Sequence, residues 1–207
     1  MKTPWLTAII VPAVLGLCWL PNAPLMANPP SSPCSNENPE PPSSERRDAI
    51  IPRHNLRFEI PRNYEIIWDD DPRMADTLRL SIRNPTDVAF LDCAREHGPR
   101  GAGHQVSDII VEIKPRPSHV QQIEDILDSA ISQNRDFTRN TIAGEEAITW
   151  IQEFRANHIT YNAALLHPDG EHLIHIFVGD SGGAIAPQEV DVLEMVIDSF
   201  AFGRISW

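Results

Sequence analysis

Apolar and polar residues alternate along several short stretches of the chain, which is the pattern of a strand that buries one of its two faces. The alternation is clear in Leu56–Ile60, which is followed by a proline, and in Thr77–Arg83. We expect strands at residues 56–60, 77–83, 106–113, 147–154, 159–166 and 173–178, with a further short extended piece at 64–68. The residues Pro168–Gly170 predict a turn that joins the last two strands into a hairpin.

A helical period replaces this alternation in two segments. Ser118 and Gln121 have the spacing of a capping box, which begins a helix. The apolar face of that helix would hold Val120, Ile123, Leu127, Ala130 and Ile131. Pro187 suits the first position of a closing helix. Its apolar face would hold Val190, Leu193, Ile197 and Phe200. A shorter helix is expected after Thr86. The order of the elements predicts an α+β fold, with a mostly antiparallel sheet of about five to six strands flanked by helices.

Residues 1–27 have the pattern of a secretory signal peptide. Lys2 precedes an almost wholly apolar stretch, Trp5–Leu20, which is short for a membrane span, and Ala27 offers a small residue for cleavage. Retention as an uncleaved anchor stays open. Lipidation at Cys18 is disfavoured because the large residue Leu17 precedes it. We therefore expect an exported protein.

Residues 28–49 are rich in proline and serine and contain few apolar residues. Such a segment cannot form a core, so we expect a disordered, extended tether. The remaining residues, 50–207, have the length of a single domain.

The charge of the chain narrows the range of partners. Lys and Arg number 17 against 29 Asp and Glu, for a net charge of −12. A surface this acidic repels phosphate backbones, so nucleic acid is excluded as a partner, and anionic membrane surfaces are disfavoured. A cation or the basic patch of another protein would be attracted.

Two cysteines remain once the signal peptide is removed, Cys34 and Cys93. Export places them in an oxidising compartment, where a disulfide between the tether and the domain is one interpretation. Two free thiols are the other, since Cys34 falls in the tether.

The predicted hairpin carries the densest group of metal-ligating residues. His167 and His172 flank its turn, where two imidazoles can face each other and share a divalent metal ion. His175 is three residues from His172, so on a strand it points to the opposite face. Asp169 or Glu171 completes the site only if the turn directs a carboxylate toward the histidines. The alternative interpretation is a solvated hairpin end.

A glycine-rich loop carries a local group of basic side chains: Arg95, His97, Arg100 and His104. An exposed loop of this kind is a candidate surface for docking a partner. It lacks the Lys-Ser/Thr pair of a phosphate-binding loop, and a strand follows it instead of a helix. The chain contains no nucleophile elbow and no other recognisable catalytic motif.

The order of elements resembles that of the PsbP family, the extrinsic proteins of the photosynthetic oxygen-evolving complex. The resemblance covers residues 56–202. It depends on a first strand that ends in Glu59-Ile60-Pro61, on a long helix in the middle, on Gly144–Ala147, and on a closing helix that runs into Ser199–Phe202. It implies an α-β-α sandwich and a non-enzymatic protein that docks onto other proteins. No functional residue can be transferred by position.

Three hypotheses follow. The first is an exported, non-enzymatic binding or assembly module that docks onto a protein complex at a membrane surface, in the periplasm, the thylakoid lumen or the extracellular space. The second is a small secreted metal-assisted enzyme or metal-binding protein that uses His167 and His172. The third is a structural protein of the cell envelope. The sequence implies no cofactor beyond a divalent metal ion, and it leaves the oligomeric state open.

Overall fold

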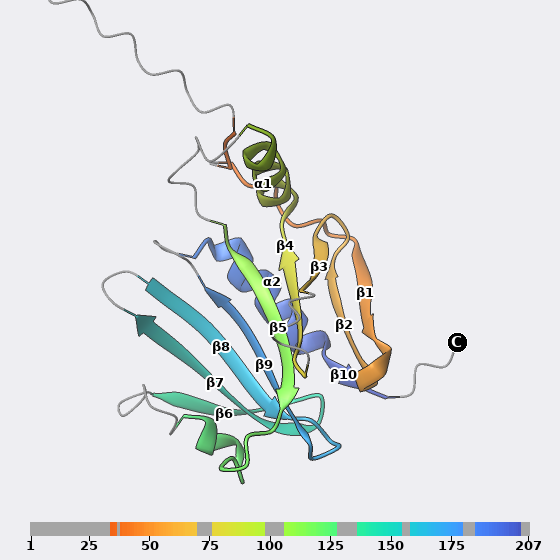
Figure 1. Ribbon diagram of the computed structural model, residues 1–207, viewed down its shortest axis with the longest axis vertical. Coiled ribbons are helices and arrows are strands. Elements are labelled where there is room, and N and C mark those ends of the chain that lie inside the picture. Colours follow the sequence, from red (N-terminus) through yellow and green to blue (C-terminus); the bar gives the residue numbers. More distant parts are fainter. Residues whose placement is uncertain are drawn as a thin grey trace, which may run out of the picture. The chain divides into compact units, whose positions relative to one another are not determined.

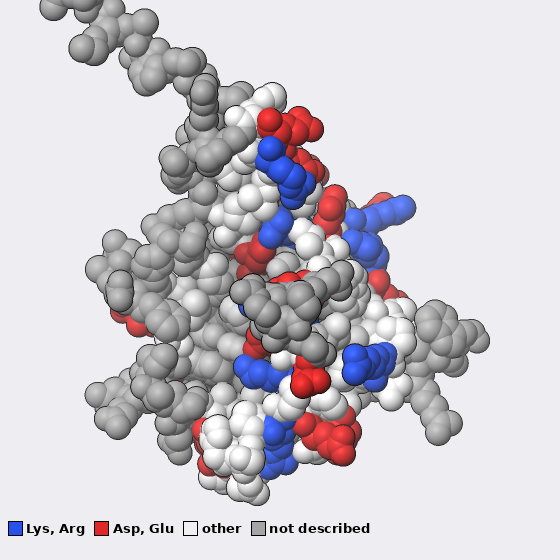
Figure 2. All heavy atoms as spheres, in the orientation of Figure 1, with Lys and Arg blue, Asp and Glu red and all other residues white. Residues whose placement is uncertain are grey.

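A computed structural model describes residues 34–36, 38–69, 76–97, 106–127, 136–154, 158–179 and 185–203 (Figure 1). These residues all belong to one compact unit, Ser32–Trp207. The predicted signal peptide lies outside them. Within these ranges, the helices are all too short or too polar to cross a membrane. Acidic and basic side chains are interspersed on the face drawn in Figure 2.

Most of the fold is one antiparallel sheet of seven strands, in the order β3-β4-β5-β9-β8-β7-β6. Its strands are β3 (Glu65–Asp69), β4 (Leu78–Arg83), β5 (Asp108–Pro115), β6 (Phe137–Ile142), β7 (Glu145–Phe154), β8 (His158–Leu166) and β9 (His172–Gly179). The predicted α+β class is confirmed. Strand β6 was missed, because its sequence FTRNTI is exposed at all but the last residue and does not alternate.

A second sheet of three strands contains β1 (Arg46–Ile51), β2 (Leu56–Pro61) and β10 (Ala201–Phe202). The 3-10 turn η1 (Pro52–His54) joins β1 to β2, and Asn55 after it is left-handed, with φ 47°. Strand β1 was hidden from sequence reasoning because only Ala49 and Ile51 bury their side chains.

The predicted disordered tether is therefore wrong over the residues described between 34 and 49. The backbone N–H of Ser43 donates to Asn63 Oδ1 at 2.8 Å, and β1 already begins at Arg46. Hydrogen bonds rather than apolar burial hold most of this segment, and composition does not reveal such bonds.

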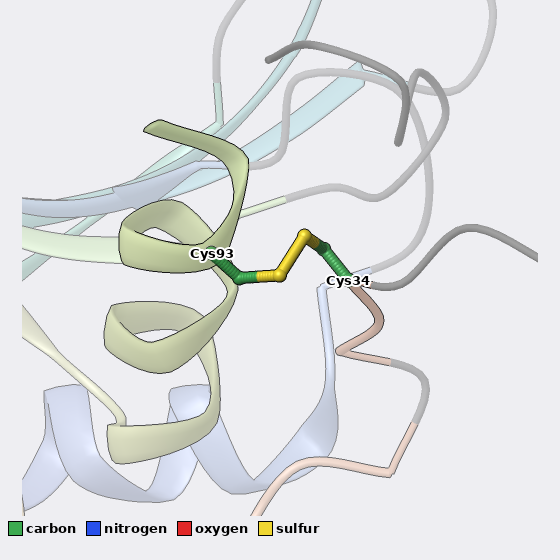
Figure 3. Close-up of a disulfide and its surroundings, with 2 residues drawn as sticks. All are labelled: Cys34 and Cys93. Carbon is green, nitrogen blue, oxygen red and sulfur yellow. A yellow bond between two sulfur atoms is a disulfide. The ribbon is translucent and has the colours of Figure 1, made fainter. Parts of the chain in front are cut away.

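A disulfide joins Cys34 to Cys93 (Figure 3). The two Cα atoms are 5.7 Å apart, and 59 positions separate the residues in sequence. Cys93 lies in helix α1 (Pro85–His97), and Cys34 is buried beside it. Closing a loop of this length stabilises the fold by about 4 kcal/mol in the chain-entropy account. The bond fastens the proline-rich segment to the domain.

Helix α1 begins differently from the prediction. Asn84 Oδ1 accepts the backbone N–H of Asp87 at 2.8 Å, so Asn84 caps the helix. The hydroxyl of Thr86, the expected cap, accepts the N–H of Glu40.

Helix α2 (Pro187–Ser199) begins at Pro187 as predicted. It packs on β2, β9 and β5, so it covers one face of only part of the large sheet. Its buried residues include Val192, Leu193 and Val196. Leu193 and Phe200 are buried as predicted, whereas Val190 and Ile197 are only partly buried, so the apolar face is rotated by less than a quarter turn from the predicted one.

The predicted helix from Ser118 is wrong over the residues that are described. A turn stands at residues 118 and 119, followed by the 3-10 helix η3 (Ile123–Ile126), whose capping box is formed by Gln122 and Asp125. The guanidinium of Arg116 donates to the carbonyls of Val120 (2.6 Å) and Gln121 (2.5 Å). An α-helix would need those carbonyls for its own hydrogen bonds. Ala130 and Ile131 lie outside the described residues.

The two faces of the large sheet form separate cores. On one face, residues such as Ile109, Ile176 and Val178 are fully buried against α2 and the small sheet. On the other face, Ile148 and Leu173 pack against residues of the η3 segment. Burial of one such side chain contributes about 1.5–3 kcal/mol.

Candidate metal centre

The turn between β8 and β9 fixes the position of the Asp169 carboxylate. The backbone N–H of His167 donates to the carbonyl of His172 at 2.9 Å and closes the hairpin. Gly170 has φ 75°, a conformation that favours glycine. Asp169 Oδ1 accepts the N–H groups of Glu171 (2.8 Å) and His172 (3.1 Å). The other carboxylate oxygen, Oδ2, is directed toward the histidines.

Both predicted histidines meet this second oxygen. Asp169 Oδ2 lies 2.7 Å from His172 Nδ1 and 2.9 Å from His167 Nδ1. One ligand atom from each of the three residues lies within 4.8 Å of the other two. The turn thus brings His167, Asp169 and His172 together, and we call these three residues the histidine cluster. Glu171, the other carboxylate considered from the sequence, is not part of this group.

The hydrogen bonds of His167 fix its neutral tautomer. Its Nε2 lies 2.9 Å from the backbone carbonyl of His54, which can only accept, so Nε2 carries the proton. Nδ1 is then an acceptor and takes the N–H of Asp169 at 3.2 Å. His167 is 8% exposed, so this arrangement is shielded from bulk water. The lone pair of Nδ1 therefore points toward the carboxylate of Asp169.

A third imidazole borders the cluster from a distant part of the chain. His54 ends η1, and its buried ring stands edge-on to His172 with centroids 5.0 Å apart. It is separated from His167 by 113 positions, so sequence reasoning missed it. The only available signal was a single histidine between Ile51 and Leu56, which is too common a pattern to indicate a site.

The charges of the cluster favour a bound cation. Burial raises the pKa of Asp169, but the N–H of Glu171 and the imidazoles of His172 and His167 outweigh it and lower that pKa to about 2. Burial lowers the pKa of His54, and the neighbouring imidazoles of His172 and His167 lower it further. The carboxylate is ionised at neutral pH, and His54 resists protonation beside it.

His175 lies on the opposite face of β9, as the alternation predicts. Its ring is stacked between Trp150 (centroids 5.5 Å apart) and Phe177 (4.5 Å), and its Nε2 donates to Asn162 Oδ1 at 3.1 Å. Burial lowers its pKa to about 4. His175 is half-buried in a stack of aromatic rings and does not belong to the cluster.

The predicted docking loop is described only in part. Arg95 and His97 lie in the last turn of α1, while Arg100 and His104 fall outside the described residues. Arg95 pairs with Asp92 at 2.7 Å on the surface, and Figure 2 shows acidic and basic side chains together at the end of the molecule where Figure 1 draws α1. The docking role of this loop stays a prediction.

Comparisons with known proteins show a distant structural likeness. No protein-family model matches the chain, and no curated protein matches it in sequence. The solution structure of cyanobacterial PsbP (CyanoP) from Synechocystis sp. PCC 6803 superposes with a TM-score of 0.43 at 10% sequence identity, over 77% of this chain and 94% of that one. A likeness this distant carries no conclusion about sites or function.

Proposed function

We propose that the protein is an exported binding protein that holds one divalent transition-metal ion in the histidine cluster. The observation that carries the proposal is the convergence of two imidazole nitrogens on a single oxygen of Asp169. Export is supported by the signal-peptide pattern of residues 1–27.

The argument for a cation begins with His167. Its Nδ1 and Asp169 Oδ2 are 2.9 Å apart, and in the neutral tautomer both atoms are acceptors. Two acceptors this close repel each other unless a positive charge lies between them. A proton or a metal ion removes that repulsion, and a metal ion also engages His172.

The donor set indicates the class of metal. Two imidazoles and one carboxylate suit Zn²⁺ and neighbouring transition metals better than Ca²⁺ or Mg²⁺, which take mainly oxygen ligands. The bond from His167 Nε2 to the carbonyl of His54 is the kind of outer hydrogen bond that orients metal-binding histidines.

The spacing of the ligand atoms sharpens this assignment. With metal–ligand distances of about 2.0–2.1 Å, two ligands at right angles are about 2.9 Å apart, and two at the tetrahedral angle are about 3.3 Å apart. The distances of 2.7 and 2.9 Å to Asp169 Oδ2 are nearer the right-angle value. These two distances match a right-angle arrangement, as in a six-coordinate ion, and tetrahedral Zn²⁺ requires both ring nitrogens to lie a few tenths of an ångström farther from Asp169 Oδ2.

The test is a calorimetric titration of the protein without a polyhistidine tag and with its disulfide intact. We expect one Zn²⁺ or Mn²⁺ per chain, with affinity at least tenfold weaker in Asp169→Asn and His172→Gln. Asparagine retains the oxygen that accepts the turn's N–H groups, so Asp169→Asn should fold normally. His119→Gln, at an exposed histidine outside the cluster, is the matched control. Equal affinity in all four proteins, or no binding by the wild type, would refute the proposal.

Docking onto a partner protein is a second candidate function, and a groove of about 1030 Å³ beside α2 favours it. Concave surfaces of this size are typical of binding sites. Chemical cross-linking in the protein's native envelope should return one reproducible partner complex. Repeated absence of such a complex would argue against docking.

A further inference from the structure

We infer that the groove between α2 and the outer strands β6, β7 and β8 binds an extended, basic, partly apolar segment of a partner protein. This inference depends on the docking function proposed above, and it identifies the surface and the chemistry of the partner.

The groove exists because α2 covers only part of its face of the sheet. The helix packs on β2, β9 and β5. The outer strands β7 and β6 extend beyond it (Figure 1). A space of about 1030 Å³ is left between Val190, Leu193 and Ile197 of the helix and the strands beside them. A volume this large accommodates a stretch of peptide chain.

The groove contains partly uncovered apolar side chains among polar ones. Ile151 of β7 is 57% exposed, which is unusual for so large an apolar side chain in a strand. Tyr161 of the neighbouring β8 lines the same groove, as do Leu193 and Ile197 of α2. When an apolar side chain of a partner covers these residues and removes them from water, the free energy of the complex falls.

The rim of the groove is acidic. The described residues that line the groove include four carboxylates and neither Lys nor Arg. The carboxylates are those of Asp136, Glu153, Glu194 and Asp198. A complementary partner therefore carries Lys or Arg beside its apolar residues, because opposite potentials across an interface favour encounter and fix the register.

The backbone at the groove indicates that the partner segment is extended. Strand β6 pairs with β7 only as far as Trp150, opposite Phe137. The residues from Ile151 to Phe154 pair with β8 on one side, and no described strand pairs with them on the other. A strand edge that has no neighbouring strand can accept an added strand from another chain. Such a strand would direct alternate side chains toward Ile151 and the acidic rim.

This groove is independent of the histidine cluster. It lies at the Tyr161 end of β8, whereas His167 follows the other end of the same strand. Substitutions in the groove should leave metal binding unchanged, so each proposal can fail alone.

The probe for the groove is a synthetic twelve-residue peptide of alternating Leu and Lys, and binding is followed by fluorescence anisotropy. We expect binding that weakens as salt rises, and a loss of at least tenfold in Ile151→Arg. Ile151 is mostly exposed, so the variant should fold. The matched controls are Glu146→Gln, at an exposed position of β7 outside the groove, and a peptide of alternating Leu and Glu, which should not bind. Equal binding by Ile151→Arg and Glu146→Gln would overturn the inference. The inference would also be overturned if the peptide bound only after residues 128–135 were replaced by a Gly/Ser linker. That result would mean that the groove is occupied by this segment of the same chain.

Cross-linking in the native envelope separates this inference from the function on which it depends. A partner that cross-links to wild type and not to Ile151→Arg supports both. A partner that cross-links equally to the two proteins retains docking and overturns the groove as its surface. No partner with either protein overturns docking itself.

Discussion

Two histidines three residues apart on β9 have opposite surroundings. His172 lies beside the carboxylate of Asp169, 2.7 Å from Oδ2, at the end of a hairpin. His175 lies on the other face of the strand, between the rings of Trp150 and Phe177. The sheet directs the imidazole of His172 toward a carboxylate and that of His175 into a stack of aromatic rings.

The difference shows what makes a histidine a candidate ligand. The residue type and the strand are the same, so only the neighbours differ. Around His172, a carboxylate oxygen and a ring nitrogen of His167 converge, and the described rings beside it are the imidazoles of His54 and His167. Around His175, burial opposes any positive charge, whether a proton or a metal ion.

The largest expected effect is a loss of folding stability at low pH that is caused by His175. Its pKa is about 4 in the folded protein against 6.5 for the ordinary group. Between these values the unfolded chain binds a proton that the folded one does not, so stability falls as pH falls from 6.5 to 4. The loss is on the order of 3 kcal/mol. Urea unfolding at pH 4.5 and 7 should show this loss in the wild type relative to His175→Phe, and parallel pH profiles of the two proteins would contradict the assignment.

An effect of similar size and opposite sign is expected from Glu189, a buried acid on α2. Burial raises its pKa to about 7 from 4.5, although hydrogen bonds from Asn84 and Tyr64 oppose the rise. Between these values the folded chain holds a proton that the unfolded chain has lost, so stability falls as pH rises from 4.5 to 7, on the order of 3 kcal/mol.

Glu189→Gln should abolish this fall while keeping a neutral side chain of the same shape. The same urea series therefore separates the two groups, whose contributions nearly cancel in the wild type between pH 4.5 and 6.5. A Glu189→Gln protein that still loses stability with the wild-type slope toward pH 7 would contradict the raised pKa.

A somewhat smaller effect is the stabilisation of the fold by Zn²⁺ bound at the histidine cluster. Zn²⁺ at a hundred times its dissociation constant should stabilise the fold by about 2.7 kcal/mol. Thermal unfolding should then shift upward by about 5–10 °C in a domain of this size. We expect the shift in the wild type and in His175→Phe, and none in Asp169→Asn. A shift of equal size in Asp169→Asn would place the ion elsewhere.

The smallest expected effect concerns His54. Its ring borders His172 but does not belong to the three residues whose ligand atoms converge. The contact that orients His167 comes from the His54 backbone, which a substitution retains. His54→Phe should therefore change Zn²⁺ affinity less than threefold in the same titration. A tenfold loss would make His54 a fourth ligand.

Sequence reasoning reached the cluster because its geometry is local. A period of two and a Pro-Asp-Gly turn were sufficient to place His167 opposite His172 and to direct His175 away. The contribution of His54 depends on the packing of the small sheet against the hairpin, and no local pattern encodes that packing. The helix expected from Ser118 failed for a similar reason, because Arg116 takes the carbonyls of Val120 and Gln121.

The groove could not be predicted from the sequence either, because it also depends on tertiary packing. The apolar period of α2 correctly predicted a helix, but Val190 and Ile197 were assigned to the core, although they line an open groove. Which strands a helix covers depends on the tertiary fold, and the period alone does not fix it.

The most direct test of the central claim is a Zn²⁺ titration of the histidine-selectively ¹⁵N-labelled protein, followed by NMR of the ring nitrogens. The account predicts that Nδ1 of His167 shifts and saturates at one equivalent, together with a ring nitrogen of His172. The signals of His175 and His119 should stay where they are. Shifts spread equally over all four histidines, or no saturation at one equivalent, would contradict a metal centre in the β8–β9 turn.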